Sequence, residues 1–295
     1  MPFRGKKGTE IQIFLVRAKM SKGPGLFSDI GKKPKDLLTK DYSSDHKLTV
    51  SSHSTTGVAI TSTAVKKSGL SSGDVAAQYR HKNTTLDVKV DTQSNISTTL
   101  TFIDILPSTK TIASLKLPDY NSGKLEVQYF HEHATLTTII ALNQSPVVDV
   151  SATVGTPSIA IGGEAGYDTT SGGFTKYTAG INVTRPDSSA SIIICDKGDS
   201  IKASYVHHLD QLKKSAAVAE VARKFSTNEN TFTVGGSLAF DRLTQIKARF
   251  NNHGKLGALL QHEVIPKSVL TISSEVDTKA LDKIPRLGLA IALKP

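Results

Sequence analysis

Short segments that alternate large apolar residues with polar or small ones run from about Lys47 to Leu293, and Gly, Pro, Asn or Asp separates each segment from the next. Residues 286–294 show the pattern most clearly, because every second position from Leu287 to Leu293 carries a large aliphatic side chain. A period of two residues predicts strands with two different faces. Strands of about 9 to 11 residues with short turns would divide this stretch into roughly 18 to 20 strands.

The second face of these segments is polar or small along the whole stretch. The apolar faces include Val58, Ile60, Leu86, Val88, Val90, Leu100, Phe102, Leu125, Val127, Ile192, Ile194, Phe232, Val234, Leu270 and Ile272, and the opposite faces include Lys116, Glu126, Gln128, Glu164, Lys202, Lys247, Arg249 and Arg286. In a soluble sheet protein the apolar faces meet in a core, whereas an apolar outside with a polar inside is typical of a barrel that faces lipid and encloses water. The sequence therefore predicts an all-β fold, a transmembrane antiparallel β-barrel.

Residues 26–42 give the only convincing helical pattern. One side of this helix would carry Leu26, Phe27, Ile30, Leu37 and Leu38. Pro34 would interrupt an interior turn, so we expect a bend or a 3₁₀ stretch near residues 31–33. On a soluble protein the helix would pack on the core, and in a barrel it would lie in the lumen against the wall.

The prediction divides the chain into an N-terminal extension at residues 1–19, a pore helix segment at residues 20–43 and the barrel at residues 44–295. The extension is basic with one short apolar stretch at residues 11–16. It fits a targeting segment or an upstream start ahead of a natural start at Met20. The second interpretation is favoured, because the extension lacks the serines of a transit peptide.

Residues 210–225 fit the alternation poorly, because their run of alanines has helical propensity. A helix at this point would separate two strands and interrupt the barrel. We therefore predict a strand here.

Composition narrows the choice of partners. The formal net charge is +10, there is no Trp, and Cys195 is the single cysteine. A basic chain could have nucleic acid, an anionic membrane or anionic solutes as its partner. Binding to nucleic acid would favour one basic patch with interleaved aromatic residues. Here the lysines and arginines are scattered along the polar faces, which favours small anions and indicates no specific nucleic-acid site.

The sequence contains few residues in an arrangement that would suit catalysis or metal binding. His131 and His133 flank Glu132, and His207 adjoins His208, but neither pair has a third ligand at the spacing of a zinc site. We expect no metal, no cofactor and no enzymatic activity. The lysines of residues 32–40 are more informative, because on a helix inside a lumen they would attract anions. The alternative is that they form the solvated face of an ordinary surface helix.

Several motifs resemble the voltage-dependent anion channels, the mitochondrial porin family. They lie at residues 31–42, 57–61, 116–131, 244–252 and 261–279, and the motif at 116–131 looks like the plant-type members. The resemblance covers about residues 20–295 and is specific.

The resemblance implies a voltage-gated, weakly anion-selective diffusion pore in the mitochondrial outer membrane, with the N-terminal helix inside its lumen. The implied barrel has about 19 strands, a count that belongs to the family and does not follow from the spacing. An odd count makes the first and last strands parallel, near Leu48 and Leu289. The implied partners are membrane lipid and small anions such as chloride, ATP and ADP. A homo-oligomer and cytosolic kinases stay open as further partners.

The resemblance also assigns roles to individual residues. Lys32, Lys35 and Lys40 match basic helix positions implicated in anion and nucleotide contact. Their positions on the polar faces of the strands, and not the resemblance, add Lys116, Lys202, Lys247 and Arg249 to the residues expected to contact anions in the pore. Ile30 matches the apolar residue that anchors the helix to the wall. The residues that match the family's sorting signal are Arg286, Gly288, Ile291 and Leu293.

Two features depart from the family's pattern, and two alternative classes of protein stay open. Pro34 stands where relatives usually have a small residue, which affects the expected helix geometry. The apolar face of residues 86–90 lacks the membrane-facing carboxylate that some animal members carry, so regulation through it is not expected. The alternatives are a soluble or peripheral basic binding protein with an antiparallel sheet core and a protein-import pore of the same barrel superfamily.

Overall fold

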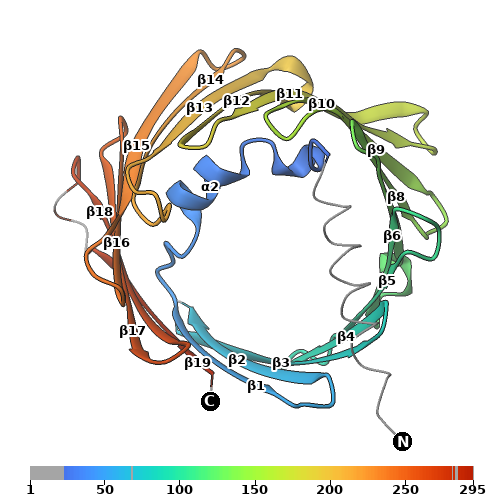
Figure 1. The fold of residues 1–295 in the computed structure, drawn as a ribbon, viewed down its shortest axis with the longest axis horizontal. Coiled ribbons are helices and arrows are strands. Elements are labelled where there is room, and N and C mark those ends of the chain that lie inside the picture. Colours follow the sequence, from blue (N-terminus) through green and yellow to red (C-terminus); the bar gives the residue numbers. More distant parts are fainter. Residues whose placement is uncertain (1–22, 68, 281, 283–284, 295) are drawn as a thin grey trace, which may run out of the picture.

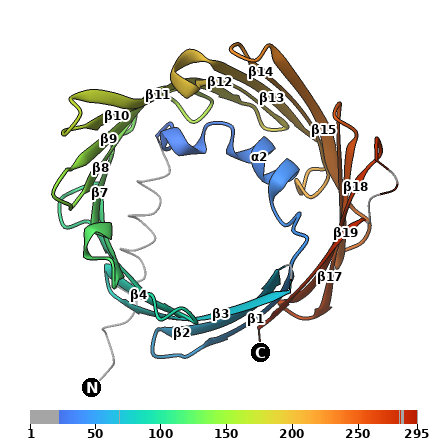
Figure 2. The ribbon, with the colours of Figure 1, turned by 180° about the vertical axis from the view of Figure 1, so that it is seen from behind.

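The computed structural model describes residues 23–294 except 68, 281 and 283–284. Among these residues, 19 strands form one closed barrel, and a short helical segment lies inside it along the wall (Figures 1 and 2). The helical segment consists of the 3₁₀ helix η1 (Phe27–Asp29) and the α-helix α2 (Lys32–Thr39). None of the described helices is long and apolar enough to cross a bilayer.

The strands follow one another around the barrel in chain order. They are β1 (His46–His53), β2 (Val58–Lys67), β3 (Leu70–His81), β4 (Thr84–Asp91), β5 (Ile96–Ile103), β6 (Thr109–Leu117), β7 (Lys124–Phe130), β8 (Ala134–Ala141), β9 (Val147–Gly155), β10 (Ile159–Asp168), β11 (Gly173–Thr184), β12 (Ser188–Cys195), β13 (Ser200–His208), β14 (Ala216–Lys224), β15 (Glu229–Ala239), β16 (Thr244–Asn251), β17 (Lys255–Ile265), β18 (Ser268–Asp277) and β19 (Arg286–Leu293). Two further 3₁₀ turns, η2 (Tyr120–Ser122) and η3 (Asp196–Gly198), lie between strands.

A parallel pair closes the barrel, while consecutive strands pair in antiparallel fashion. In this pair His46 of β1 lies opposite Leu289 of β19, and Leu48 lies opposite Ile291. The predicted barrel, its strand count and the parallel closure are confirmed.

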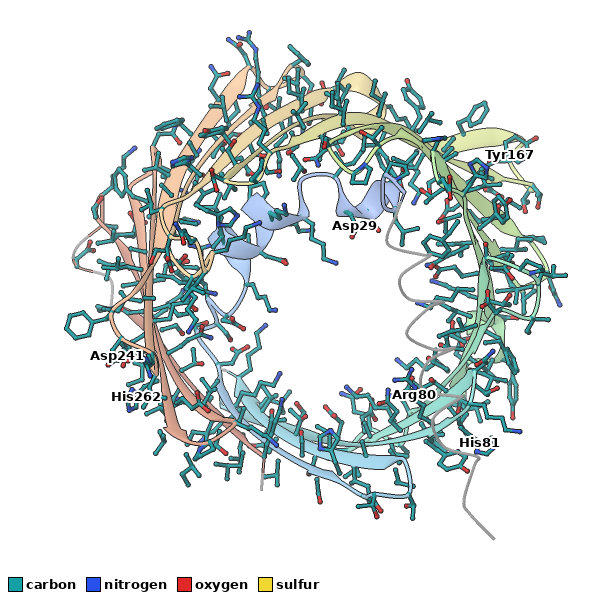
Figure 3. The ribbon with its side chains drawn as sticks, viewed as in Figure 1. Asp29, Arg80, His81, Tyr167, Asp241 and His262 are labelled. Carbon is teal, nitrogen blue, oxygen red and sulfur yellow. The ribbon has the colours of Figure 1, made fainter. Side chains whose placement is uncertain are left out.

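The two faces of the strands separate as predicted. In the β18–β19 ladder, Ile272 pairs with Leu289 on the outer face and Ser273 pairs with Gly288 on the inner face. Figure 3 shows the same alternation on β3, where Arg80 is directed into the lumen and the next residue, His81, lies outside. The outer surface is therefore apolar and the inner surface polar, which suits a lipid exterior and a hydrophilic lumen.

Strand β14 confirms a strand within residues 210–225, but it covers only Ala216–Lys224, and residues 210–215 belong to the loop before it. Its residues pair with both β13 and β15. The ladder satisfies the backbone donors and acceptors of this segment on both sides, so the barrel overrides the helical propensity of its alanines.

The prediction of a helix at residues 26–42 with a bend or a 3₁₀ stretch near residues 31–33 is partly confirmed. The interruption is present, but it lies at residues 30–31 and the 3₁₀ turn precedes it. The segment breaks at Ile30, which is extended, and at Gly31, which caps α2 with a φ of 71°. Pro34 lies in the first turn of α2, where a backbone N–H would have no acceptor within the helix, so the proline does not break it. The α-helix also ends earlier than predicted, because Lys40 is already extended.

Candidate functional site

The N-terminal segment, residues 23–45, follows the inner wall of the barrel from β8 to β19 (Figures 1 and 2). At one end, the hydroxyl of Thr135 in β8 donates a hydrogen bond to the carbonyl of Gly25. Helix α2 lies against β13 to β16. At the other end, the N–H of Leu289 in β19 donates to the carbonyl of Asp45 at 3.2 Å. The segment is thus attached to the wall at both ends and along its length.

An apolar contact holds α2 to the wall. Leu38 is only 3% exposed and packs against Val206, Ala216 and Val218, which point inward from β13 and β14. Apolar side chains at these inward positions interrupt the polar inner face, and this interruption is the sequence signal that would have located the contact. Sequence reasoning missed the importance of Leu38.

Ile30, the expected helix anchor, is also buried, at the break between η1 and α2. Its side chain faces Gly180 of β11, where a Cβ atom would lie 3.2 Å from Ile30 Cγ2. Phe27 occupies a similar place beside Gly162 of β10. The position of Ile30 suits an anchor, and that role stays a prediction.

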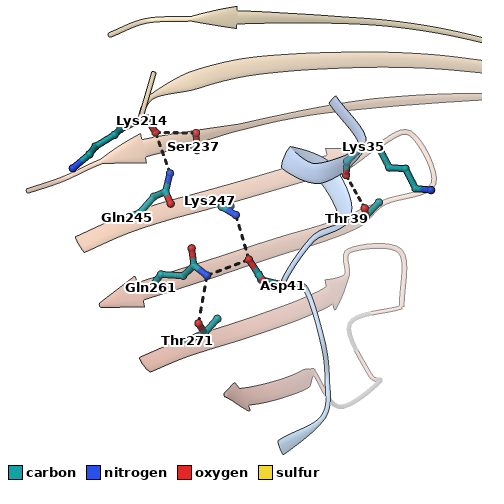
Figure 4. A network of polar contacts seen from close by, with 9 residues as sticks. All are labelled: Lys35, Thr39, Asp41, Lys214, Ser237, Gln245, Lys247, Gln261 and Thr271. Carbon is teal, nitrogen blue, oxygen red and sulfur yellow. Dashed lines mark hydrogen bonds and ion pairs between the residues drawn. The ribbon is translucent and has the colours of Figure 1, made fainter. Parts of the chain in front are cut away.

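Asp41 connects the linker, residues 40–45, to two neighbouring strands (Figure 4). Its carboxylate lies 3.6 Å from the ammonium of Lys247 in β16 and accepts a hydrogen bond from the amide of Gln261 in β17 at 3.2 Å. Asp41 has a φ of 72°, a left-handed conformation that Asp tolerates better than most residues. Lys247 is 8% exposed, so its charge is largely covered by this contact.

Arg249 of β16 makes a second attachment. Its guanidinium donates to the carbonyl of Leu38 at 2.6 Å and to the carboxylate of Glu275 in β18 at 2.7 Å. It also lies over the ring of Tyr42, 4.4 Å from the ring centre, which is a cation–π arrangement. Lys247 and Arg249 therefore hold the N-terminal segment in this structure, and their contact with permeating anions stays a prediction.

The other predicted pore cations are distributed over the lumen. Lys32, Lys35 and Lys202 line one cavity of about 460 Å³ between α2 and the strands β12 to β14. Lys40 begins the linker, and Lys116 lies exposed on β6. The structure thus brings three of the seven predicted residues together and places the other four apart from them.

The ion pairs of the wall join strands that are neighbours or lie two apart. Lys89 lies 3.1 Å from Asp74, and Lys202 lies 3.4 Å from Glu220. Lys176 lies 3.3 Å from Asp149 and 3.6 Å from Glu164. On α2, only Lys32 has a carboxylate partner among the described residues, Asp29 at 3.5 Å. These pairs offset part of the wall charge, and the lysines of the helix add positive potential inside the lumen.

The residues of the expected sorting signal lie on both faces of β19. Arg286 lies opposite Glu275 in the ladder and lines a small cavity with Tyr42 and Ser43. Gly288 points inward, whereas Ile291 and Leu293 lie on the outer face. The signal itself stays a prediction.

The candidate metal ligands do not assemble into a site. His131 and His133 meet edge to face with ring centres 6.2 Å apart, and His207 and His208 lie on opposite faces of β13. Across the described part of the chain, no group of three or more His, Cys, Asp or Glu side chains is placed to hold a metal ion.

One carboxylate outside the strands is strongly hydrogen-bonded. Asp241, in the loop between β15 and β16 (Figure 3), accepts from the N–H groups of Leu243 and Thr244 at 2.6 Å each. The bond from Leu243 contributes most to holding the pKa of Asp241 below its usual range. This carboxylate thus stays ionised and orders the turn at one end of the barrel.

We expect Arg249→Gln to loosen the attachment of α2, because Gln removes the cation over Tyr42 and the pair with Glu275. Hydrogen bonds to charged groups contribute about 1.5 to 3 kcal/mol each, so the open state should become less uniform and show more subconductance levels. Single-channel recording measures this. Lys116→Gln is the matched control, since it removes one lumen charge from a strand that the described N-terminal segment does not contact. Equal numbers of subconductance levels in Arg249→Gln and Lys116→Gln would contradict the prediction.

A closed barrel with an apolar exterior, a charged lumen and a helix along its inner wall defines a membrane pore of the β-barrel class. A family model described as eukaryotic porin matches residues 23–288, and the chain belongs to this family.

Similar proteins in plants agree with this assignment. The mitochondrial outer membrane protein porin 2 of Arabidopsis thaliana is 65% identical over 276 residues, which cover 94% of this chain and 100% of the relative. The mitochondrial outer membrane protein porin 5 of Oryza sativa subsp. japonica is 63% identical and covers 93% of this chain and 99% of its own length. The outer plastidial membrane protein porin of Pisum sativum is 49% identical, with coverage of 94% and 100%.

Proposed function

We propose that this chain forms a voltage-gated, weakly anion-selective diffusion pore of the mitochondrial outer membrane. The single observation that carries the proposal is the helix α2, which holds lysines in the lumen while Leu38 and Arg249 fasten it to the wall. The two relatives with the higher identities are named as porins of the mitochondrial outer membrane, which supports the location. Carbonate extraction of mitochondria should leave the protein in the membrane pellet.

The selectivity is expected to be weak because ion pairs neutralise part of the wall charge. Ion pairs such as Lys89–Asp74 and Lys202–Glu220 reduce the field of the wall. Lys33, Lys35 and Lys40 make no ion pair with a described residue, so the helix supplies a modest excess of positive potential. A modest excess favours anions without excluding cations.

The permeating solutes that suit this lumen are chloride, ATP, ADP and other metabolite anions. Lys32, Lys35 and Lys202 line the cavity between α2 and the wall together with Ser204, and the carboxylates of Asp36 and Glu220 also line it. Lysines and hydroxyls are donors that phosphate oxygens accept, so this cavity is where we expect a nucleotide to slow during passage.

Open-state selectivity tests the proposal directly. Chloride should permeate better than potassium at low salt, and the preference should weaken as salt rises, because charges are screened over about 10 Å at 0.1 M. Reversal potentials in a salt gradient, recorded once at low and once at high mean salt concentration, measure the preference for chloride over potassium. An open state that prefers cations would refute the proposed selectivity.

Other candidates have weaker support. A protein-import pore would share the barrel, but the high-identity relatives over nearly the whole chain are named as porins. The apolar outer face argues against a soluble binding protein. The similarity to the plastidial porin of pea favours testing plastid envelopes in the same fractionation. A homo-oligomer and docking by cytosolic kinases stay proposals.

A further inference from the structure

The inner face of Gly288 is occupied by the linker. A Cβ atom at Gly288 would overlap the carbonyl oxygen of Ser43 and would lie 2.8 Å from its carbonyl carbon. It would also lie 2.5 Å from the hydroxyl oxygen of Ser273 in β18. Main-chain atoms such as those of Ser43 cannot rotate away as a flexible side chain can. A side chain at position 288 and the linker therefore cannot both occupy their present places.

The surrounding contacts bring the linker to this point. The hydroxyl of Ser273 donates a hydrogen bond to the carbonyl of Ser43. Two residues later, the carbonyl of Asp45 accepts from the N–H of Leu289, which continues the β1–β19 ladder. Between these contacts the chain crosses the inner face of β19, and it then enters β1. A glycine on the inner face has no side chain, so it leaves room for the main chain of the linker to pass this close to β19.

We infer that Gly288 is a positioning residue for the pore helix, because it and Ser273 seat the linker that fixes where α2 lies in the lumen. This role is separate from recognition of β19 as a sorting signal. Only the expected effect of Gly288 on conduction rests on the proposed pore function. The seating itself is a property of the folded chain.

Cys195, the single cysteine of the chain, is a native probe of the helix position. It is partly exposed and lines the cavity between α2 and the wall together with Ile30, Gly31 and Lys35. Because Cys195 faces this cavity, the position of α2 affects how easily a thiol reagent reaches it. Its rate of modification should therefore rise when α2 moves away from the wall.

The experiment compares wild type, Gly288→Ala, Ser273→Ala and the control Gly73→Ala, each full-length and refolded without any sorting machinery. Gly73 lies on β3, and a Cβ there would make only ordinary contacts, the nearest at 3.4 Å to the carbonyl oxygen of Thr63. We expect a maleimide to modify Cys195 several-fold faster in Gly288→Ala. The increase should be smaller in Ser273→Ala and absent in Gly73→Ala. In planar bilayers, Gly288→Ala should also shift the voltage dependence.

Wild-type rates of Cys195 modification in both Gly288→Ala and Ser273→Ala would overturn the inference. If Gly288→Ala does not form a barrel, Ser273→Ala decides alone, because it removes one hydrogen bond and leaves the sheet pairing intact. The cysteine readout does not depend on conduction. Faster modification in a chain that fails to show anion preference would therefore support the seating and refute the proposed function.

Discussion

The change Leu289→Lys is expected to lower the free energy of unfolding by about 2 to 4 kcal/mol, the cost of a cation on the lipid face near the bilayer midplane. Leu289 lies near the middle of β19, is 38% exposed on the outer face and pairs with Ile272. The residues that pair with Leu289 are Ile272 and His46, and neither carries a carboxylate that could pair with the new lysine. Unfolding by urea from lipid vesicles measures the change.

The neighbouring residue supplies the matched control. Ala290 lies on the inner face opposite Thr271, and it lines a cavity that also holds Asp41, Asp45 and Lys47. Ala290→Lys should therefore be tolerated. Val88 of β4, on the outer face opposite Ala77, should behave like Leu289. Equal losses of stability for Leu289→Lys and Ala290→Lys would show that the assignment of faces is wrong.

The combined change of Lys32, Lys35 and Lys40 to Glu is expected to lower the anion preference of the open pore strongly and to shift its voltage dependence. All three side chains are exposed to the lumen, and Lys32 would also lose its pair with Asp29. A membrane potential acts on each displaced unit charge with about 2.3 kcal/mol per 100 mV, so partial movement of a few charges biases a two-state equilibrium.

Planar bilayers with a salt gradient give both readouts. The triple change of the same lysines to Gln is the control, because it removes the charge without reversing it and should produce an intermediate effect. A triple Glu variant that keeps wild-type selectivity would place the charge sensor elsewhere, in the wall charges such as Lys116 or Lys202.

The barrel was predictable because its requirements are local. Each strand that faces lipid needs an apolar residue at every second position, and this constraint is written into short segments such as residues 286–293. Where local propensity conflicted with the barrel, the pattern of the neighbours was the better guide, as in β14, whose alanines form a strand between β13 and β15.

The helix shows where local reasoning fails. The effect of Pro34 depends on its position in the helix, and Gly31 starts α2 late enough for Pro34 to fall in the first turn. The sequence identified the N-terminal lysines and placed Leu38 on the apolar side of the helix. It did not show what Leu38 contacts, and it did not single out Asp41. Their importance comes from Val206 and Lys247, which are remote in the chain.

By itself the sequence determined the two faces of the wall and the approximate number of strands, because alternation is a property of neighbouring residues. It also placed Lys247 and Arg249 on the inner face. Only the tertiary structure decided that these two side chains contact the linker and Leu38. The physical reason is that the partner of an inward side chain depends on which segment lies across its strand. The closed shape of the barrel sets the path of the N-terminal segment across those strands.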